Sequence, residues 1–472
     1  MTEQELSKIC GLSNAAIEAP AGHGKTEMIV DIVEHTNGRQ LLLTHTHAGV
    51  DALQKRLHRR KVPKEKYAIS TIAAFCIKWG LAFHNSASID KDLSPYEKNA
   101  GRYYSQFYDG AKTVFENLWA GDILRATYSG IIVDEYQDCS LAHHKMFLVL
   151  NRYIPVIVLG DPLQGIFSFG EPLVDWGSIE FNKVNVQTYP WRWRGTNPLL
   201  GQYLTAIRGK LLPTLSGQIC QFDIQTCNNS ITFIDSSQFN PYALLKGLSP
   251  YRSVLYVAKW ERQQIEFSNQ MAGIFQVDEK QDCELLYRFS NLFDSTHGSK
   301  LMRKTIEFIE QCATKVNKEV SSYINRLDSA SFDFSRIKKH QDFGKLLVEL
   351  QEKDRHEVVA QICNWFKNKH EFKFYRKELY YEMLRSIDYS RVNNISILDA
   401  ALKIRKDSSL QKRYPQFRCL ASRTLLSKGL EFDCVIIDNR TALTAKEFYV
   451  AMTRAMKKIY IISSSTHLIL QP

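Results

Sequence analysis

Residues 19–26, with the sequence APAGHGKT, have the residue types of a loop that holds phosphate groups. Glycines let backbone N–H groups approach phosphate oxygens, and a helix that starts after such a loop adds its positive end. In this arrangement Lys25 meets the β- and γ-phosphates and the Thr26 hydroxyl ligates Mg²⁺. Ala19 stands where the strict pattern has glycine. The expected nucleotide contacts are Ala21, Gly22, His23, Gly24, Lys25 and Thr26.

A pair of carboxylates, Asp134 and Glu135, follows the apolar run Ile131–Val133, 109 positions after Lys25. At the end of a buried strand, Asp134 can ligate Mg²⁺ and Glu135 can activate the attacking water. An acidic pair after a strand is often only a solvated turn. Downstream of a phosphate loop, however, the pair indicates hydrolysis of a nucleoside triphosphate. We therefore predict an ATPase that uses ATP and Mg²⁺.

Similar apolar runs indicate the sheets that must position these groups. Val156–Leu159 precedes Gly160 and Asp161, Cys434–Ile437 precedes Asp438, and Ile459–Ile462 lies near the end of the chain. Continuous β-branched runs are typical of strands covered on both faces, as in a parallel α/β sheet. Polar groups at the carboxyl ends of such strands line the ligand crevice.

Two stretches interrupt this pattern. Residues 85–125 are aromatic and polar, which indicates a small insertion. Residues 281–394 are charged and helical in pattern, because Phe343, Leu346, Leu347 and Leu350 fall at helix spacing. We expect this second stretch to be a helical insertion between strand-rich segments.

The bulk composition narrows the class of protein. A chain of 472 residues favours two to four domains, and a net charge of +11 favours an anionic partner such as nucleic acid. Ten scattered cysteines without a Cys-x-x-Cys pair argue against zinc. The N-terminus lacks the pattern of a secretory signal, and no run is long and apolar enough to span a membrane. We expect a cytoplasmic protein without a membrane partner.

Several ordered segments resemble the motifs of UvrD/Rep-type DNA helicases of superfamily 1A. They are residues 134–138 (DEYQD, motif II), 160–167 (GDPLQGIF, motif III), 427–433 (SKGLEFD, motif V) and 449–455 (YVAMTRA, motif VI). The resemblance implies that Gln137 couples the ATP site to DNA, that Gln164 senses the γ-phosphate, and that Arg454 is an arginine finger. Arg192 is the favoured motif IV arginine, with Arg194 as the competitor, and Glu431 is a further candidate nucleotide contact.

The resemblance also implies contacts to DNA and to the adenine base. Residues 44–48 are similar to motif Ia, and residues 70–75 are similar to the next DNA-contacting motif. Gln4, 21 positions before Lys25, is a candidate reader of adenine. The expected DNA contacts are Thr44, His45, Thr46, Arg56, Phe75, Phe167 and Lys428, with Phe75 and Phe167 as platforms for bases.

We accordingly expect an α/β protein with two RecA-like P-loop lobes built on parallel sheets, plus small helical insertions. The first lobe is expected over residues 1–190, the second over 191–280 and 395–472, and the helical insertion over 281–394. The implied function is an ATP-dependent translocase or helicase on single-stranded DNA, or on duplex DNA with a single-stranded tail. The family implies 3′ to 5′ polarity and a role in DNA repair, recombination or antiphage defence.

Two departures from the family leave alternatives open. Leu425 stands where motif V usually has histidine, and the helical insertion is shorter than the corresponding family subdomain. Both favour a DNA-stimulated ATPase or DNA-sensing subunit that unwinds only with a partner. By size and architecture the chain resembles the helicase subunit of Gabija-type antiphage systems, which works with a nuclease partner. A P-loop nucleotide switch and a degenerate helicase scaffold are the remaining alternatives.

Overall fold

A computed structural model describes residues 1–90, 100–166, 172–224, 229–278, 283–409 and 417–472. Its contacts divide the chain into two compact units. Unit 1 contains residues 1–235, 427–432 and 439–472, and unit 2 contains residues 236–426 and 433–438. Unit 1 therefore draws its residues from three stretches of the sequence.

The first sheet, in unit 1, has six parallel strands in the order β3-β2-β4-β5-β1-β6. The strands are β1 (Asn14–Glu18), β2 (Gln40–Thr44), β3 (Tyr67–Thr71), β4 (Gly130–Val133), β5 (Val156–Gly160) and β6 (Lys183–Val184). Every residue of β2, β4 and β5 is buried. Because the strands are parallel, the segments that follow β1, β4 and β5 begin at the same edge of the sheet.

Alternate side chains of this sheet pack into two separate cores. Ile17, Leu42 and Ile132 pack with α1 (Glu3–Cys10), α2 (Lys25–His35) and α3 (His47–Arg59). Leu43 and Val133 point to the other face, and their core includes side chains of four more helices. These are α4 (Ile72–Ala82), α6 (Ala100–Phe115), α7 (Leu118–Thr127) and α8 (Leu141–Asn151). The strand period of two thus places helices on both faces of the sheet.

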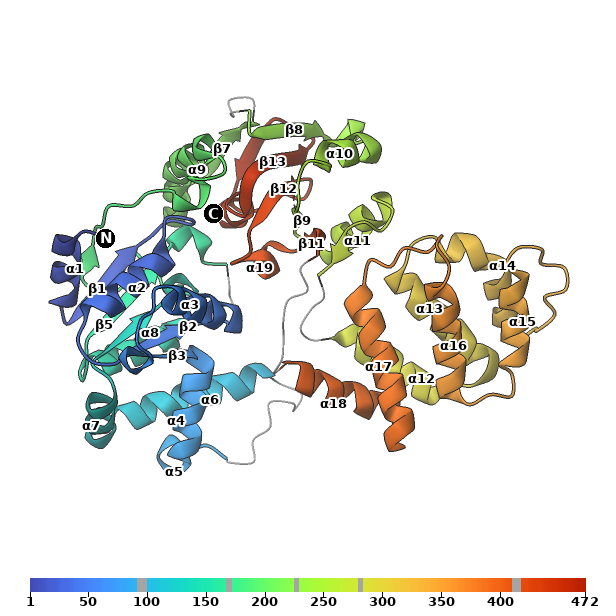
Figure 1. Ribbon diagram of the computed structural model, residues 1–472, viewed down its shortest axis with the longest axis horizontal. Helices are drawn as coiled ribbons and strands as arrows, with labels where there is room; N and C mark the ends of the chain where they lie inside the picture. The colour runs from blue at the N-terminus through green and yellow to red at the C-terminus, as the bar shows by residue number, and fades with distance from the viewer. Residues whose placement is uncertain (91–99, 167–171, 225–228, 279–282, 410–416) are drawn as a thin grey trace. The chain divides into compact units, whose positions relative to one another are not determined.

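The stretch 85–125, predicted to be an insertion, is mostly helical where the structure describes it. The short helix α5 (His84–Ala87) and α6 pack together, and α4 packs on α6 (Figure 1). Phe107 and Phe115 of α6 are buried in the same core as the sheet. The insertion therefore extends the hydrophobic core of unit 1.

The remaining elements of unit 1 include two helices and four strands. The helices are α9 (Pro198–Leu211) and α20 (Ala445–Met452), and the strands are β7 (Cys220–Asp223), β8 (Ile231–Asp235), β13 (Ala455–Ser463) and β14 (His467–Leu470). β13 pairs with β8 in parallel, with Ile459 opposite Ile231. β14 pairs with β7 in antiparallel register, which joins the C-terminal strand to a segment more than 200 residues earlier.

The second sheet also has six strands, in the order β10-β11-β9-β12-β13-β8. The elements of unit 2 around it are α10 (Pro241–Leu248), β9 (Val254–Val257), α11 (Glu261–Gln270), β10 (Gln276–Val277), β11 (Cys419–Ser422), α19 (Thr424–Ser427) and β12 (Phe432–Asp438). β11 and β12 both pair with β9 in parallel, and β10 pairs with β11 in parallel. The two parallel sheets confirm the predicted α/β fold class.

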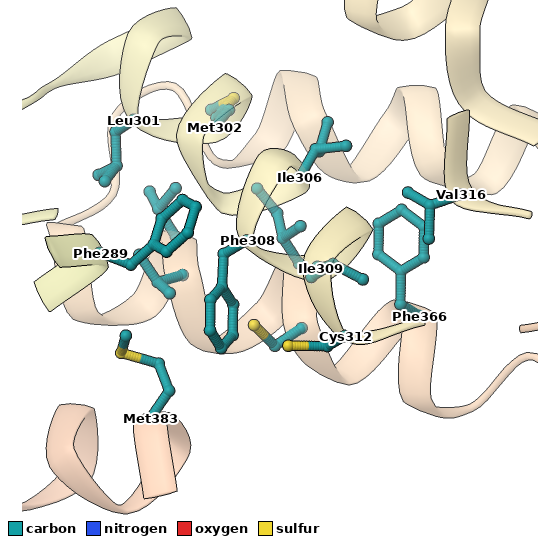
Figure 2. Packing of buried hydrophobic residues seen from close by; sticks show 14 of the residues in the cluster. Phe289, Leu301, Met302, Ile306, Phe308, Ile309, Cys312, Val316, Phe366 and Met383 are labelled. Carbon is teal, nitrogen blue, oxygen red and sulfur yellow. The ribbon is translucent and has the colours of Figure 1, made fainter. Parts of the chain in front are cut away.

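Most of unit 2 is a helical subdomain with its own core. Its helices are α12 (Glu284–Ser295), α13 (Gly298–Cys312), α14 (Val316–Asp328), α15 (Gln341–Glu349), α16 (Arg355–Lys367), α17 (Lys377–Asn393) and α18 (Ile397–Ser409). Figure 2 shows Phe289, Phe308 and Met383 converging in this core, and all three are fully buried. The helices continue past residue 394 to Ser409, and the predicted domain bounds, including 281–394 for the helical insertion, stay predictions.

Among the described residues, no helix combines the length and the hydropathy that crossing a bilayer requires.

Phe308 offers a test of the helical core. Its ring is fully buried and contacts the rings of Phe289, Phe293 and Tyr380. Phe308→Ala should lower the free energy of unfolding by about 3–5 kcal/mol, because it removes apolar contacts and leaves a cavity. Val392→Ala, at a side chain that is 78% exposed, should change it by less than about 0.5 kcal/mol. Urea titration followed by tryptophan fluorescence measures both, and equal midpoints would contradict this packing.

Candidate nucleotide-binding and catalytic site

The loop between β1 and α2 has the backbone geometry of a phosphate cradle. Gly22 and Gly24 have φ values of 71° and 88°, a left-handed conformation that glycine adopts without strain. Gly24 caps α2, so the first-turn N–H groups of that helix lack intrahelical acceptors. His23 faces the protein: its Nδ1 lies 2.8 Å from the Ala21 carbonyl oxygen and its Nε2 lies 3.1 Å from Thr205 Oγ1. Burial lowers the pKa of His23, so its ring is neutral at pH 7.

The two predicted carboxylates lie beside the predicted phosphate-binding lysine. Lys25 Nζ is 2.7 Å from Glu135 Oε1 and 3.7 Å from Asp134 Oδ1. Glu135 has a positive φ of 55°, an uncommon conformation for a residue with a side chain. Strained backbone of this kind concentrates at functional sites. The structure thus brings Lys25, Asp134 and Glu135 together at the end of β4.

Burial and charge pull the pKa values of these groups in opposite directions. Burial raises the pKa of Asp134 to about 6, against the effect of Lys25. Burial would also raise the pKa of Glu135, but Lys25 and Lys428 lower it below its ordinary value. Burial would lower the pKa of Lys25, and Glu135 and Asp134 raise it instead. Glu135 and Lys25 therefore form a charged pair at neutral pH.

Gln137 joins the segment after β4 to the segment after β5. Its Nε2 donates to Glu135 Oε2 at 2.5 Å, and its Oε1 accepts from the Asp161 N–H at 2.9 Å. The Gln137 side chain is buried, and its bond to the Asp161 N–H forms away from water, whereas its bond to Glu135 is partly buried. A displacement of Glu135 would therefore be felt at Asp161 and at the short helix Pro162–Gln164 that follows it.

Asp161 is the centre of a network that the sequence motifs did not assign. None of its surface is exposed, and Oδ2 accepts from the Ala21 N–H at 2.9 Å, the Tyr449 hydroxyl at 3.0 Å and Gln164 Nε2 at 3.1 Å. Arg208 of α9 lies 3.1 Å from Oδ1. One signal for Arg208 was available in the sequence. It is a single arginine in a helix whose other buried side chains are Leu200, Leu204, Ile207 and Leu211.

Two of the predicted arginines lie in this site. Arg454 is buried, and its Nη2 donates to Gln164 Oε1 at 3.3 Å. Burial, reinforced by the charge of Arg192, lowers the pKa of Arg454 to about 9. Arg192 donates from Nε to Glu431 Oε1 at 2.8 Å, and its backbone N–H donates to the Gly22 carbonyl oxygen at 3.0 Å. The phosphate loop, Arg192 and Arg454 therefore belong to one cluster.

The competing arginine occupies different surroundings. Arg194 is exposed, and its guanidinium lies 5.1 Å from the ring centroid of Trp191. Trp193, between the two arginines, is fully buried, and its Nε1 donates to the Ala455 carbonyl oxygen at 2.7 Å. The backbone N–H of Arg192 contacts the phosphate loop at Gly22, and its side chain donates to Glu431 and Thr453. The geometry favours Arg192 over Arg194 as the motif IV arginine.

Lys428 was expected to contact DNA, but in this structure its ammonium contacts the carboxylates. It forms an ion pair with Asp138, lies 3.8 Å from Glu135 Oε2, and donates to the Gln164 carbonyl oxygen at 2.7 Å. Its side chain is 6% exposed. The physical reason is charge compensation, because buried carboxylates need cations nearby. In this conformation Lys428 therefore compensates carboxylates and does not offer its ammonium to DNA.

The residues present fit a Mg²⁺–nucleotide complex. Nζ of Lys25 is buried and held by ion pairs without a hydrogen bond, so a phosphate oxygen can become its acceptor. Within the described ranges, no group of three or more His, Cys, Asp or Glu side chains could hold a metal by itself. Mg²⁺ does not require such a group, because it binds through one or two carboxylates together with phosphates and water. Asp134 and the Thr26 hydroxyl would provide the protein ligands.

The predicted DNA contacts are only partly available in this conformation. Thr46 is exposed and caps α3, whereas Thr44 is buried, and Arg56 is paired with Glu27 at 2.5 Å. His45 Nε2 lies 3.5 Å from Cys139 Sγ, and burial lowers the pKa of His45 to about 3.

Of the two predicted base platforms and the predicted adenine contact, the structure describes Phe75 and Gln4. Phe75 is 4% exposed and stacks on Phe115 at 5.6 Å, so its faces are covered by the core. Phe75 is therefore not available as a base platform in this conformation. Phe167 lies outside the described residues. Gln4 is exposed at the start of α1, and its contact with adenine stays a prediction.

Comparisons with known families agree with this site. The loop, the carboxylates and the parallel sheet are features of a P-loop nucleotide-binding domain, and a family model described as an AAA domain matches residues 3–170. A second model, described as a UvrD-like helicase C-terminal domain, matches residues 423–462. Together with the motifs, these matches support a UvrD/Rep-like helicase. No curated protein matches the chain.

One solved structure that matches the chain is described as "Complex structure of Arterivirus nonstructural protein 10 (helicase) with DNA". The sequences are 10% identical, the TM-score is 0.35, and the match covers 97% of this chain. The chain spans 62% of the length of that viral chain. A likeness at this level carries no argument about function.

The Asp161 network can be tested through Arg208. Arg208→Met should lower the free energy of unfolding by about 3–5 kcal/mol, because it leaves a buried carboxylate without its cation. The double variant Arg208→Met/Asp161→Asn should recover part of that loss, since the uncompensated charge is gone. Arg125→Met breaks an exposed pair with Asp122 and a contact with the Tyr153 ring, and it should cost about 1 kcal/mol or less. Chemical denaturation of these proteins, with the wild type and the single variant Asp161→Asn included, measures the coupling between the two positions. Additive losses would argue against a shared network.

Proposed function

We propose that the chain is an ATP-dependent translocase on single-stranded DNA, with 3′ to 5′ polarity as in the family it resembles. The observation that carries the proposal is the convergence of Lys25, Glu135, Gln164, Arg192 and Arg454 on one phosphate-binding loop. A loop alone would fit many nucleotide-binding proteins. The added arginines and the water-activating carboxylate fit hydrolysis.

Each group has a definite task in this proposal. Lys25 and the first-turn N–H groups of α2 would hold the β- and γ-phosphates, and Asp134 and Thr26 would hold Mg²⁺. Bound Mg²⁺ neutralises charge on the phosphates. Glu135, which is ionised at neutral pH, would accept a proton from the attacking water. The products are ADP and inorganic phosphate.

The arginines would stabilise the charge that develops during transfer. Arg454 and Arg192 donate here to Gln164, Thr453 and Glu431, all of which are neutral or partly exposed groups. Exchanging these acceptors for phosphate oxygens requires little desolvation of new charge. A correctly placed arginine contributes about 10³–10⁵ in rate in comparable phosphoryl-transfer enzymes.

Coupling to DNA would pass through Gln137 and Gln164. Gln137 bonds both Glu135 and the Asp161 backbone, and Gln164 accepts from Arg454. Gln164 belongs to the predicted motif III (residues 160–167), where the family contacts a base. Hydrolysis at Glu135 would thereby change the position of that segment, as translocation requires.

A second candidate is a DNA-stimulated ATPase that unwinds only with a partner, such as the nuclease of a Gabija-like antiphage pair. The observation that favours it is the low availability of the predicted DNA contacts, since Thr44 and Phe75 are buried and Arg56 is ion-paired. Unwinding of a tailed duplex by the purified chain alone would separate the two candidates.

The central test is ATP hydrolysis with and without single-stranded DNA. We expect DNA to stimulate turnover, and Lys25→Ala and Glu135→Gln to lower it at least about 100-fold, because they remove a phosphate contact and the general base. Lys145→Ala, an exposed lysine on α8, is the matched control and should behave like the wild type. Turnover that ignores DNA would contradict the translocase and favour a nucleotide switch.

The two candidate arginines predict opposite results. Arg192→Ala should lower kcat by about 10³–10⁵, because Arg192 lies against the phosphate loop. Arg194→Ala should leave kcat within a few-fold of the wild type, because Arg194 stacks on an exposed tryptophan. Single-turnover ATP hydrolysis measures both. A severe defect in Arg194→Ala alone would reassign motif IV.

A further inference from the structure

Unit 2 contains a pocket of about 310 Å³ on its helical subdomain, remote in sequence from the ATPase motifs. It is lined by three lysines, four aromatic residues and one glycine: Lys367, Lys373, Lys377, Phe372, Phe374, Tyr380, Tyr381 and Gly273. This volume lies at the lower end of the range for sites that bind small ligands. It suits one planar ring with a charged group and is too small for a duplex.

The three lysines form a concentration of positive charge without acidic partners. Within the described part of the chain, none of them has a carboxylate at ion-pair distance, while the neighbouring Lys369 is paired with Asp342 at 2.7 Å. Two acids lie close to these lysines in sequence: Glu371 is 3.8 Å from the His340 ring, and Glu378 is 3.9 Å from Arg405. The three lysines line one pocket, and their combined positive charge would attract an anionic ligand.

Tyr381 gives the pocket an accessible aromatic face. Its side chain is 44% exposed, and Lys367 Nζ lies 5.2 Å from its ring centroid. Tyr380 beside it is buried and packs on Phe374 at 4.4 Å, so Tyr381 stands on a packed aromatic base. Cations interleaved with an exposed aromatic ring are the arrangement that binds single-stranded nucleic acid.

The position of Lys373 is fixed by the backbone around it. The Thr314 N–H donates to the Lys373 carbonyl oxygen at 3.0 Å, and Gln276 Nε2 donates to the Phe374 carbonyl oxygen at 2.9 Å. Gly273 has a φ of 73°, and a Cβ there would lie 2.7 Å from Lys373 Cβ. Only glycine permits this close approach, so the backbone at Gly273 fixes the position of this wall of the pocket.

We propose that this pocket binds one nucleotide of a single-stranded nucleic acid, with its phosphates on the three lysines and its base on Tyr381. The exposed lysines and the exposed ring leave the chain of the ligand free to continue on both sides, which favours a strand over a free mononucleotide. The inference rests on the proposed function for the identity of the strand. It adds a contact on unit 2 that none of the helicase motifs contains.

The test measures binding of a fluorescent oligo-dT to the full chain without ATP, by fluorescence anisotropy at several salt concentrations. Removing the lysines in Lys367→Ala/Lys373→Ala/Lys377→Ala should weaken binding and reduce the slope of log affinity against log salt by about 2, since each single-strand phosphate contact contributes about 0.7. Tyr381→Ala should weaken binding roughly 5- to 100-fold, and Tyr381→Phe should retain it, because the stacking face is kept.

The matched control is Lys300→Ala/Lys318→Ala/Lys345→Ala, which removes the same charge from exposed positions of the same helical subdomain. Equal losses in the control and pocket variants would overturn the proposal. So would competition by free dTMP as strong as that by the oligonucleotide, or loss of duplex binding alone.

ATP hydrolysis measured on the same samples separates this proposal from the proposed function. DNA binding that depends on the pocket, without stimulation of ATPase, would support the pocket and contradict the translocase. Stimulated ATPase with unchanged binding in the pocket variants would contradict the pocket alone. A wild-type chain that binds no oligonucleotide would overturn both.

Discussion

A carboxylate with no exposed surface loses several kcal/mol of hydration, and that loss must be offset by its neighbours. Asp161 meets this requirement with four donors that come from separate parts of unit 1: the phosphate loop at Ala21, its own turn at Gln164, α9 at Arg208 and α20 at Tyr449. Each of those segments is fixed in position by the same two oxygens. The phosphate loop is therefore anchored through the Ala21 N–H to a buried charge.

The charges nearer the reaction centre are arranged differently, because they alternate. Lys25 lies against Glu135, Glu135 lies near Lys428, and Lys428 pairs with Asp138. Such a chain stays close to neutral, so each member can exchange a partner at modest electrostatic cost. When Lys25 turns to a phosphate, as the proposed function requires, Glu135 keeps Lys428 and Gln137 and remains ionised. The network that holds the resting site thus also prepares the base.

The sequence predicted those features that depend on local pattern. The β-branched runs of β4, β5, β12 and β13 and the helix-spaced leucines of α15 are visible within a few residues, and so is the loop at Gly22 and Gly24. Long-range partners have no such signature. Lys428 is 290 positions from Asp138, and Arg208 is 47 from Asp161. Phe75 shows a further limit: an aromatic residue in a motif does not reveal which face of its helix meets the core, and here the core covers it.

Whether a basic residue of this chain can contact DNA depends on the partners that its charge already has. The net charge of +11 shows that basic residues outnumber acidic ones, but it does not show which basic residues contact DNA. Arg56 and Lys428 lie in motif-like segments, yet carboxylates already compensate them. Lys367, Lys373 and Lys377 lie in no recognised motif and share one pocket without acidic partners among the described residues. A phosphate backbone binds best to positive charge that has no acidic partner, and an exposed aromatic ring beside it can stack on a base. Among the described residues, the pocket of the helical subdomain has this combination, although no helicase motif lies there.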